Sequence, residues 1–184
     1  MITEYEERQA KLRFLYTCQK DNEIPLIINF FKDKDPYIRA EALLTLGSIG
    51  DKELYSHVIP LLNDNDQHVK YCAVECLGRL GSEHATKYLL EVAKDNSEFV
   101  VCKVINVLGR LKDKDSLDFF LLMLYNNSLS IRQEAALALE SLMYIGECRE
   151  KLNLFFEENP TKKEDFEQLY GMLKIHERMN RTFS

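Results

Sequence analysis

Apolar positions recur every 31 residues through the central part of this 184-residue chain. One apolar column consists of Ile38, Val69, Val100 and Ile131, and another consists of Leu46, Leu77, Leu108 and Leu139. A period of this length indicates a helical repeat array, in which each unit buries its apolar face against the next. Glycine follows the second column at Gly47, Gly78 and Gly109. The central part is therefore predicted to contain four copies of one unit.

Each unit is predicted to form two helices. The first helix carries an apolar stripe with helical spacing, as at Leu54, Val58, Leu61 and Leu62. The second helix opens with a residue whose side-chain oxygen can cap free backbone N–H groups: Asp35, Asp66, Ser97 and Ser128. Gly50 and Gly81 follow two of the second helices and are expected to be C-caps. With 7 glycines and 4 prolines the chain is poor in turn-forming residues, so the predicted fold class is all-α rather than all-β.

The repeat also sets the expected domain organisation, which is a single domain over residues 1–184. Residues 24–143 hold the four repeats, and residues 1–23 form an N-terminal capping helix. Residues 144–184 form C-terminal capping helices that cover the open end of the stack, because a repeat array needs ends with a polar outer side.

Two helices are expected in the C-terminal segment, at about 147–158 and 161–180. Asn159 and Pro160 separate them, because the residue before a proline disfavours helical backbone. The residues expected to pack the last helix onto the stack recur at helical spacing: Phe166, Leu169, Leu173 and His176.

The second helices share the pattern D-x-x-[I/V]-[R/K]-x-x-A-x-x-x-L-G-x-[I/L]-G. This pattern resembles the short HEAT-like repeats of phycobilisome lyase subunits and of many bacterial scaffolds, over about residues 24–143. The resemblance implies a right-handed α-solenoid of about four to five two-helix repeats with helical caps.

An Asp–Arg ladder is a further implication of the resemblance. It links an aspartate in the turn of each unit to a basic residue early in the second helix. The pairs that match are Asp33/Arg39, Asp64/Lys70 and Asn126/Arg132. The third unit has Asp95/Val101 and is expected to lack this polar link.

One face of each second helix is left for binding. Positions 38, 42, 45, 46 and 49 fall on the core side of a helical wheel, whereas positions 37, 41, 44 and 48 fall on the opposite side. In a helical solenoid this opposite side lines the concave surface, the usual binding surface of repeat proteins. The candidate protein-binding residues on it are Tyr37, Glu41, Leu44, His68, Glu75, Arg79, Phe99, Lys103, Asn106, Arg110, Glu134 and Leu137.

Aromatic and arginine side chains carry much of the binding energy at protein interfaces, and this face has both. The sequence therefore predicts a non-enzymatic scaffold that binds a partner protein or peptide on its concave face, with no cofactor. An alternative is that Tyr37 and Phe99 pack between neighbouring units and the charged residues are only solvated.

Two other functions stay open. The resemblance alone suggests a subunit of a bilin lyase or isomerase complex. HEAT-like DNA glycosylases suggest a nucleic-acid-binding module, but 24 basic against 30 acidic residues give a net charge of −6, which opposes phosphate binding.

Metal chemistry has weak support in the sequence. The HEAT-like deoxyhypusine hydroxylases hold iron with His-Glu pairs, and the matching pairs here contain no histidine: Ala40-Glu41, Tyr71-Cys72, Cys102-Lys103 and Gln133-Glu134. His68, Cys72 and Cys76 lie four apart on one helix, but a structural zinc site needs four ligands. Small buried cysteines are the commoner explanation, so no metal is expected.

The expected location is the cytoplasm. The five cysteines are odd in number and form no Cys-x-x-Cys pair, which favours a reducing compartment over a disulfide framework. The acidic start has no apolar signal segment, and no run of about 18 apolar residues could span a membrane. The oligomeric state stays open, with a monomer favoured.

Overall fold

The structure is a computed structural model that describes residues 3–18, 23–81, 83–94, 97–169 and 171. Helices and short 3-10 turns make up this part of the chain, and it contains no strand, which confirms the predicted all-α fold class. The chain divides into two compact units, Met1–Lys103 and Val104–Ser184. The prediction of one domain with four repeats and capping helices stays a prediction, as does the handedness of the solenoid.

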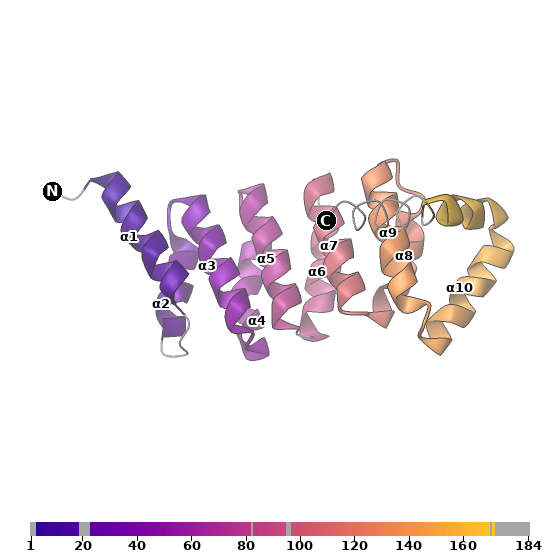
Figure 1. Cartoon of the computed structure of the whole chain (residues 1–184), viewed down its shortest axis with the longest axis horizontal. Helices are drawn as coiled ribbons and strands as arrows, with labels where there is room; N and C mark the ends of the chain where they lie inside the picture. Colours follow the sequence, from indigo (N-terminus) through magenta and orange to yellow (C-terminus); the bar gives the residue numbers. More distant parts are fainter. Residues whose placement is uncertain (1–2, 19–22, 82, 95–96, 170, 172–184) are drawn as a thin grey trace, which may run out of the picture. The chain divides into compact units, whose positions relative to one another are not determined.

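The first unit contains the first two repeats and part of the third. Its elements are α1 (Glu4–Thr17), α2 (Ile24–Asn29), α3 (Pro36–Ile49), α4 (Tyr55–Val58), α5 (Gln67–Leu80), α6 (Thr86–Val92) and the start of α7 (Glu98–Arg110). Helices α1, α3 and α5 lie side by side (Figure 1). The predicted first helices are short, and two of them, α2 and α4, continue as 3-10 turns, as at Ile59–Asn63, where Pro60 lacks the N–H that an α-helix requires.

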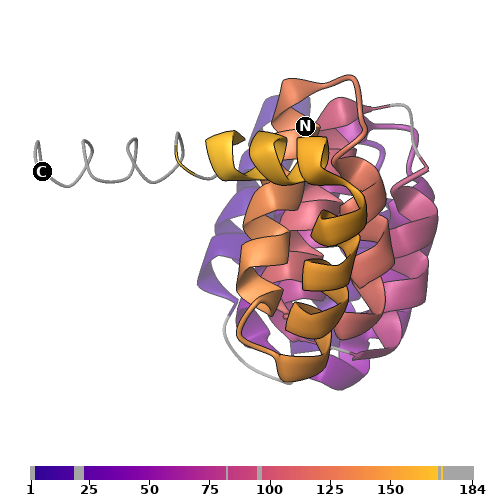
Figure 2. The same cartoon turned by 90° about the vertical axis from the view of Figure 1, so that its right-hand side faces the viewer.

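The second unit contains the end of α7, α8 (Leu117–Met123), α9 (Leu129–Leu142) and α10 (Gly146–Glu158). Residues 160–169 form a further helical stretch, and Figure 2 shows it turned away from the direction of α10. Asn159 is the C-cap of α10, which confirms the predicted boundary before Pro160. Of the residues predicted to pack the last helix, Phe166 and Leu169 are buried, whereas Leu173 and His176 lie outside the described residues.

Repeated positions have repeated structural roles. Each member of the two apolar columns is buried, from Ile38 to Leu139. A Cβ added to Gly47 would lie 3.3 Å from the Cα atom of Cys76, and one added to Gly109 would lie 3.0 Å from the Cα atom of Ala138. Glycine at these positions therefore lets neighbouring second helices approach closely, α3 to α5 in the first unit and α7 to α9 in the second.

The helix ends follow the predicted capping. Asp35 Oδ1 accepts from the N–H of Tyr37, Asp66 Oδ1 from the N–H of His68, and Ser128 Oγ from the N–H of Ile131. Ser97 precedes α7, and its carbonyl accepts the first backbone hydrogen bonds of that helix. Gly50 and Gly81 have positive φ angles of 78° and 66°, as their predicted C-cap role requires.

The predicted Asp33/Arg39 contact is present through the backbone carbonyl of Asp33, but the carboxylate that Arg39 binds belongs to the next repeat. Arg39 donates from Nη1 to the backbone carbonyl of Asp33 at 2.9 Å, but its Nε and Nη2 bind the carboxylate of Asp64 at 2.8 and 2.7 Å. The carboxylate of Asp33 instead binds Lys11 of α1 at 2.9 Å. The turn carboxylate of one repeat is thus held by the preceding second helix.

The same turn residues also order their own turns. Asp33, Asp64 and Asn126 each accept, through Oδ1, the backbone N–H two residues later at 2.9 Å. This contact is an Asx turn, which short side chains with an oxygen favour. It explains why Asp or Asn recurs with the repeat period before each second helix.

Candidate interaction surface

The first repeat shows the predicted two-sidedness of the second helix. Ile38, Ala42 and Leu46 on the core side of α3 are buried. On the opposite side Tyr37 is 38% exposed, and Glu41 and Leu44 are half-buried. The side chains predicted for binding therefore reach the surface in this repeat.

In the second repeat the same side carries a buried acidic residue. Glu75 is 8% exposed, and its carboxylate binds Arg79 Nε at 3.0 Å and Lys103 Nζ at 3.2 Å. Burial lowers the pKa of the Lys103 ammonium, but hydrogen bonds with Tyr71 and Glu75 outweigh this effect, so the pKa of Lys103 is raised. Lys103 therefore stays charged, and the three predicted residues form one ionic cluster.

Beside this cluster lies an aromatic row formed by His68, Tyr71 and Phe99. The rings of Tyr71 and Phe99 stack with centroids 4.2 Å apart, and the rings of His68 and Tyr71 are nearly parallel at 6.5 Å. Lys103 Nζ lies 4.4 Å from the centre of the Tyr71 ring, a cation–π contact. Phe99 nevertheless remains 54% exposed.

Phe99 has features of both interpretations. Its ring packs against the neighbouring repeat through Tyr71, and 54% of the residue is exposed. Tyr71 was not among the predicted binding residues. The sequence signal for Tyr71 was weak. On the helical wheel Tyr71 lies beside the predicted binding positions rather than among them, and the equivalent residues in the neighbouring repeats are Ala40 and Cys102.

The surface of the first unit extends onto α1. The guanidinium of Arg8 lies 5.0 Å from the centre of the Tyr37 ring, and Arg8 Nε binds Asp35 at 2.7 Å. A hydrogen bond with Tyr16 and the nearby Glu41 carboxylate raise the pKa of Tyr37 to about 12. Arg8 and Tyr16 were missed, although the 31-residue period places Arg8 in the column of Arg39.

In the second unit four predicted residues line one shallow pocket of about 150 Å³ between α7 and α9. They are Asn106, Arg110, Glu134 and Leu137. The floor includes Gly109, whose carbonyl accepts from Ser141 Oγ at 2.9 Å. Asn106 Nδ2 donates to Glu134 Oε2 at 3.4 Å, so two of the polar lining residues orient each other.

Four of the five cysteines are buried, whereas the histidines that the structure describes are exposed. Burial raises the pKa of Cys72 to about 11 and that of Cys76 to about 12, which keeps both thiols protonated. Cys72 Sγ lies 3.8 Å from His68 Nε2, but no group of three or more metal-ligating side chains occurs among the residues described. Thiolates are the form that binds zinc, so this helix offers no ready ligand set.

The two-helix units, the capped second helices and the Arg39–Asp64 link define a helical-repeat protein. Residues 24–102 match the family model of HEAT repeats. No curated protein matches the chain. Among the described residues no helix is long and apolar enough to cross a membrane.

Solved structures share the fold. The complex of CpcE and CpcF of phycocyanin lyase from Nostoc sp. PCC7120 matches with a TM-score of 0.65 at 17% identity, covering 83% of this chain and 65% of that one. The chain thus spans about 65% of the length of the matched lyase chain. A designed armadillo repeat protein in complex with a (KR)4 peptide matches with a TM-score of 0.54 at 16% identity, covering 91% and 93%. An engineered protein matches with a TM-score of 0.54 at 13% identity, covering 90% and 88%.

Proposed function

We propose that this protein is a non-enzymatic scaffold that binds a partner protein or peptide on the exposed face of its second helices. The observation that carries the proposal is the aromatic row. Phe99 is stacked on Tyr71 and so is held in place before a ligand arrives, while 54% of its surface remains exposed. An aromatic side chain that is fixed in advance loses little conformational entropy on binding.

The charged residues around the aromatic row restrict the chemistry of the ligand that can bind there. Glu75 is already paired with two cations, so a basic ligand gains little there. The partner is expected to place an apolar or aromatic side chain on the open face of Phe99 and a hydrogen-bond acceptor near Arg79, which is exposed. The designed armadillo repeat protein, solved with a (KR)4 peptide, supports peptide binding as a use of this kind of fold. Its peptide is basic and so differs from the ligand expected here.

The location proposed for this activity is the cytoplasm, where a reducing environment keeps thiols free. All five cysteines are free, and none of them lies in a disulfide.

A co-purification experiment tests the scaffold proposal. Proteins bound to the tagged chain are identified by mass spectrometry for the wild type, for Phe99→Ala and for Tyr144→Ala, a control at an 82% exposed aromatic outside the row. A partner lost with Phe99→Ala and retained with Tyr144→Ala supports the proposal. A partner retained equally by both variants contradicts it.

A second candidate is a subunit of a bilin lyase or isomerase complex, favoured by the match to the complex of CpcE and CpcF. This function predicts a change in visible absorbance when the chain is mixed with a bilin-bearing protein and a second lyase subunit. An unchanged spectrum would remove this candidate.

A further inference from the structure

Arg132 has in the last repeat the position that Arg39 has in the first. Both arginines use Nη1 to bind the turn that precedes their own helix. Arg39 Nη1 donates to the carbonyl oxygens of Asp33 and Lys34 at 2.9 and 3.4 Å. Arg132 Nη1 donates to those of Asn126 and Asn127 at 2.8 and 2.9 Å. The two guanidinium groups are therefore anchored in the same way.

The other two nitrogens differ in what they bind. In Arg39, Nε and Nη2 together hold the carboxylate of Asp64, which belongs to the turn of the next repeat. In Arg132, Nε and Nη2 have no hydrogen bond or ion pair with any residue that the structure describes. The position that corresponds to Asp64 is Glu157, and it lies on the exposed side of helix α10 rather than in a turn.

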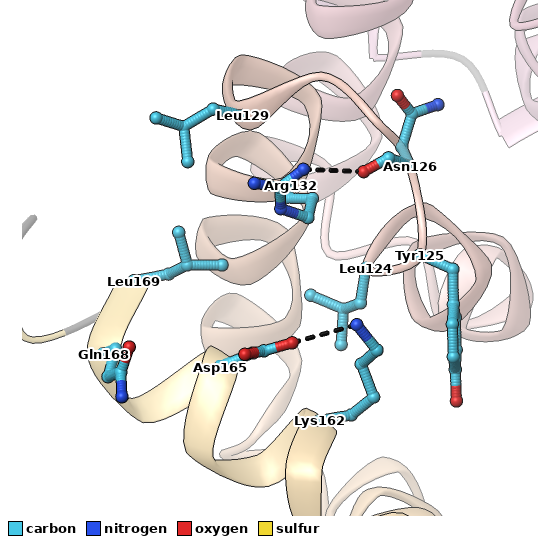
Figure 3. A pocket seen from close by; sticks show the side chains of 9 residues that line it. All are labelled: Leu124, Tyr125, Asn126, Leu129, Arg132, Lys162, Asp165, Gln168 and Leu169. Atoms are coloured by element: carbon cyan, nitrogen blue, oxygen red, sulfur yellow. Dashed lines mark hydrogen bonds and ion pairs between the residues drawn. The ribbon is translucent and has the colours of Figure 1, made fainter.

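Arg132 lines a cavity of about 310 Å³ (Figure 3). Arg132 and Lys162 supply two positive charges to its lining, against the single carboxylate of Asp165, which binds Lys162 at 2.9 Å. Leu129 and Tyr125 stand at the cavity with 51% and 50% of their surfaces exposed. The buried Leu124 and Leu169 also line it, so the cavity combines two cationic side chains with apolar walls.

We propose that this cavity binds an aspartate in a turn of a partner protein, with Nε and Nη2 of Arg132 receiving its carboxylate. The Arg39–Asp64 contact shows what the same arginine position binds when a repeat follows it. A paired arginine fork matches the two oxygens of a carboxylate, and such charge-assisted hydrogen bonds are stronger than neutral ones. Asp64 also accepts from the N–H of Asp66 at 2.9 Å, so the expected ligand is an Asp-x-Asp turn rather than an isolated carboxylate.

Charge and shape favour this occupant over others. Lys162 is paired with Asp165 at the same cavity, so Arg132 supplies the net positive charge that favours an acidic segment (Figure 3). The exposed Leu129 can contact an apolar residue beside the turn, as Leu61 and Leu62 stand beside Asp64 in this chain. The site is formed by the turn after α8, by α9 and by residues 160–169, shares no residue with the aromatic row, and adds a second contact region to the scaffold.

A peptide experiment tests the site. The probe copies residues 60–71 of this chain, which contain the Asp64 turn, and its control carries Asn at the position of Asp64. Binding to the full chain is followed by NMR of the Arg132 Nε–H group. We expect the aspartate peptide to bind at least about tenfold more tightly than the control. Because both peptides meet the same wild-type protein, the comparison does not depend on the stability of any variant.

Two variants test whether the paired Nε and Nη2 donors of Arg132 cause the difference in affinity between the two peptides. Arg132→Lys keeps the charge but removes the paired donors, so it should abolish the difference between the peptides. Arg149→Lys, an exposed change on α10, should preserve that difference. Equal affinity of the wild type for both peptides would overturn the proposal, as would tighter binding of inorganic phosphate than of the aspartate peptide. If the chain self-associates and the aspartate peptide dissociates that complex, the occupant of the cavity is a second copy of this chain, and the proposal is overturned.

Discussion

Arg39 and Asp64 lie 25 residues apart and join two successive repeats through hydrogen bonds of 2.8 and 2.7 Å. Their side chains are 15% and 12% exposed, so water screens the pair only in part. Asp64→Asn removes the charge and one acceptor but leaves the Asx turn possible. We expect it to lower the free energy of unfolding by about 1–3 kcal/mol, measured by urea denaturation.

Glu4→Gln is the matched control, since Glu4 pairs with Lys34 at side-chain exposures of 80% and 73%. An exposed pair contributes little to stability, so this variant should unfold at the wild-type urea concentration. Equal stability of Asp64→Asn and Glu4→Gln would show that the link between repeats contributes nothing.

Acid should destabilise the first unit through the turn aspartates. Burial raises the pKa of Asp64, but the hydrogen bonds from Arg39 and from the N–H of Asp66 outweigh it, so the pKa lies below the ordinary 3.8. The same balance lowers the pKa of Asp33, with Lys11 as the cation. The stabilisation is thus present above pH 3.8 and is lost as the pH falls through the lowered values.

Thermal unfolding measured from pH 7 down to about pH 2 checks this expectation. The wild-type melting temperature should fall below about pH 4, and Asp64→Asn should show a shallower fall because one of the two groups no longer titrates. Parallel curves for the two proteins would contradict the role given to Asp64.

Much of the fold follows from the 31-residue period, because the period reports buried columns and local capping. Asp35 and Asp66 cap their helices through contacts within three residues, so the local sequence contains the information. The Arg39–Asp64 partnership does not follow from one unit, since it depends on how a second unit stacks on the first. The cavity at Arg132 is still harder to predict from the sequence, because it forms where the period ends and residues 160–169 replace a repeat.

At the candidate surface, too, the pattern of a single helix predicts only part of the burial. The helical wheel placed Tyr37, Glu41 and Phe99 at the surface, and the structure has them exposed or half-buried. It also placed Glu75 there, which is 8% exposed because Lys103 from the next repeat lies over it. Contacts between neighbouring helices decide such burial, and a single-helix pattern does not contain them.

Replacement of Gly109 should disturb the approach of α9 to α7. A new Cβ would lie 3.0 Å from both the Cα and the Cβ of Ala138, closer than packed carbon atoms approach. Overpacking of this kind costs about 1–3 kcal/mol, so Gly109→Ala should lower the unfolding free energy by that amount in urea. Gly146→Ala is the control, because its Cβ would meet no atom within 4 Å in helix α10. It should leave stability unchanged or raise it, and equal losses in both variants would refute the packing argument.

The cysteines should differ in reactivity. Cys102 is half-buried, whereas Cys18, Cys72, Cys76 and Cys148 are buried, and burial raises the pKa of each of these four thiols. Because the thiolate is the reactive form, a thiol reagent near pH 7.5 should modify Cys102 first and the others only on unfolding. Mass spectrometry of the modified peptides over time checks the order. Early labelling of Cys76 in native buffer would contradict it.

The ionic cluster at Glu75 permits a double-mutant test. Glu75→Gln leaves the ammonium of Lys103, 15% exposed, without its carboxylate, and it should lower the free energy of unfolding by about 1–3 kcal/mol. Lys103→Met leaves Glu75 paired with Arg79 at 3.0 Å and should cost less. The double variant should be more stable than Glu75→Gln alone, because an uncompensated charge costs more than an apolar replacement of the pair. Urea denaturation of the four proteins measures the coupling, and strictly additive changes would show that Glu75 and Lys103 do not interact in solution.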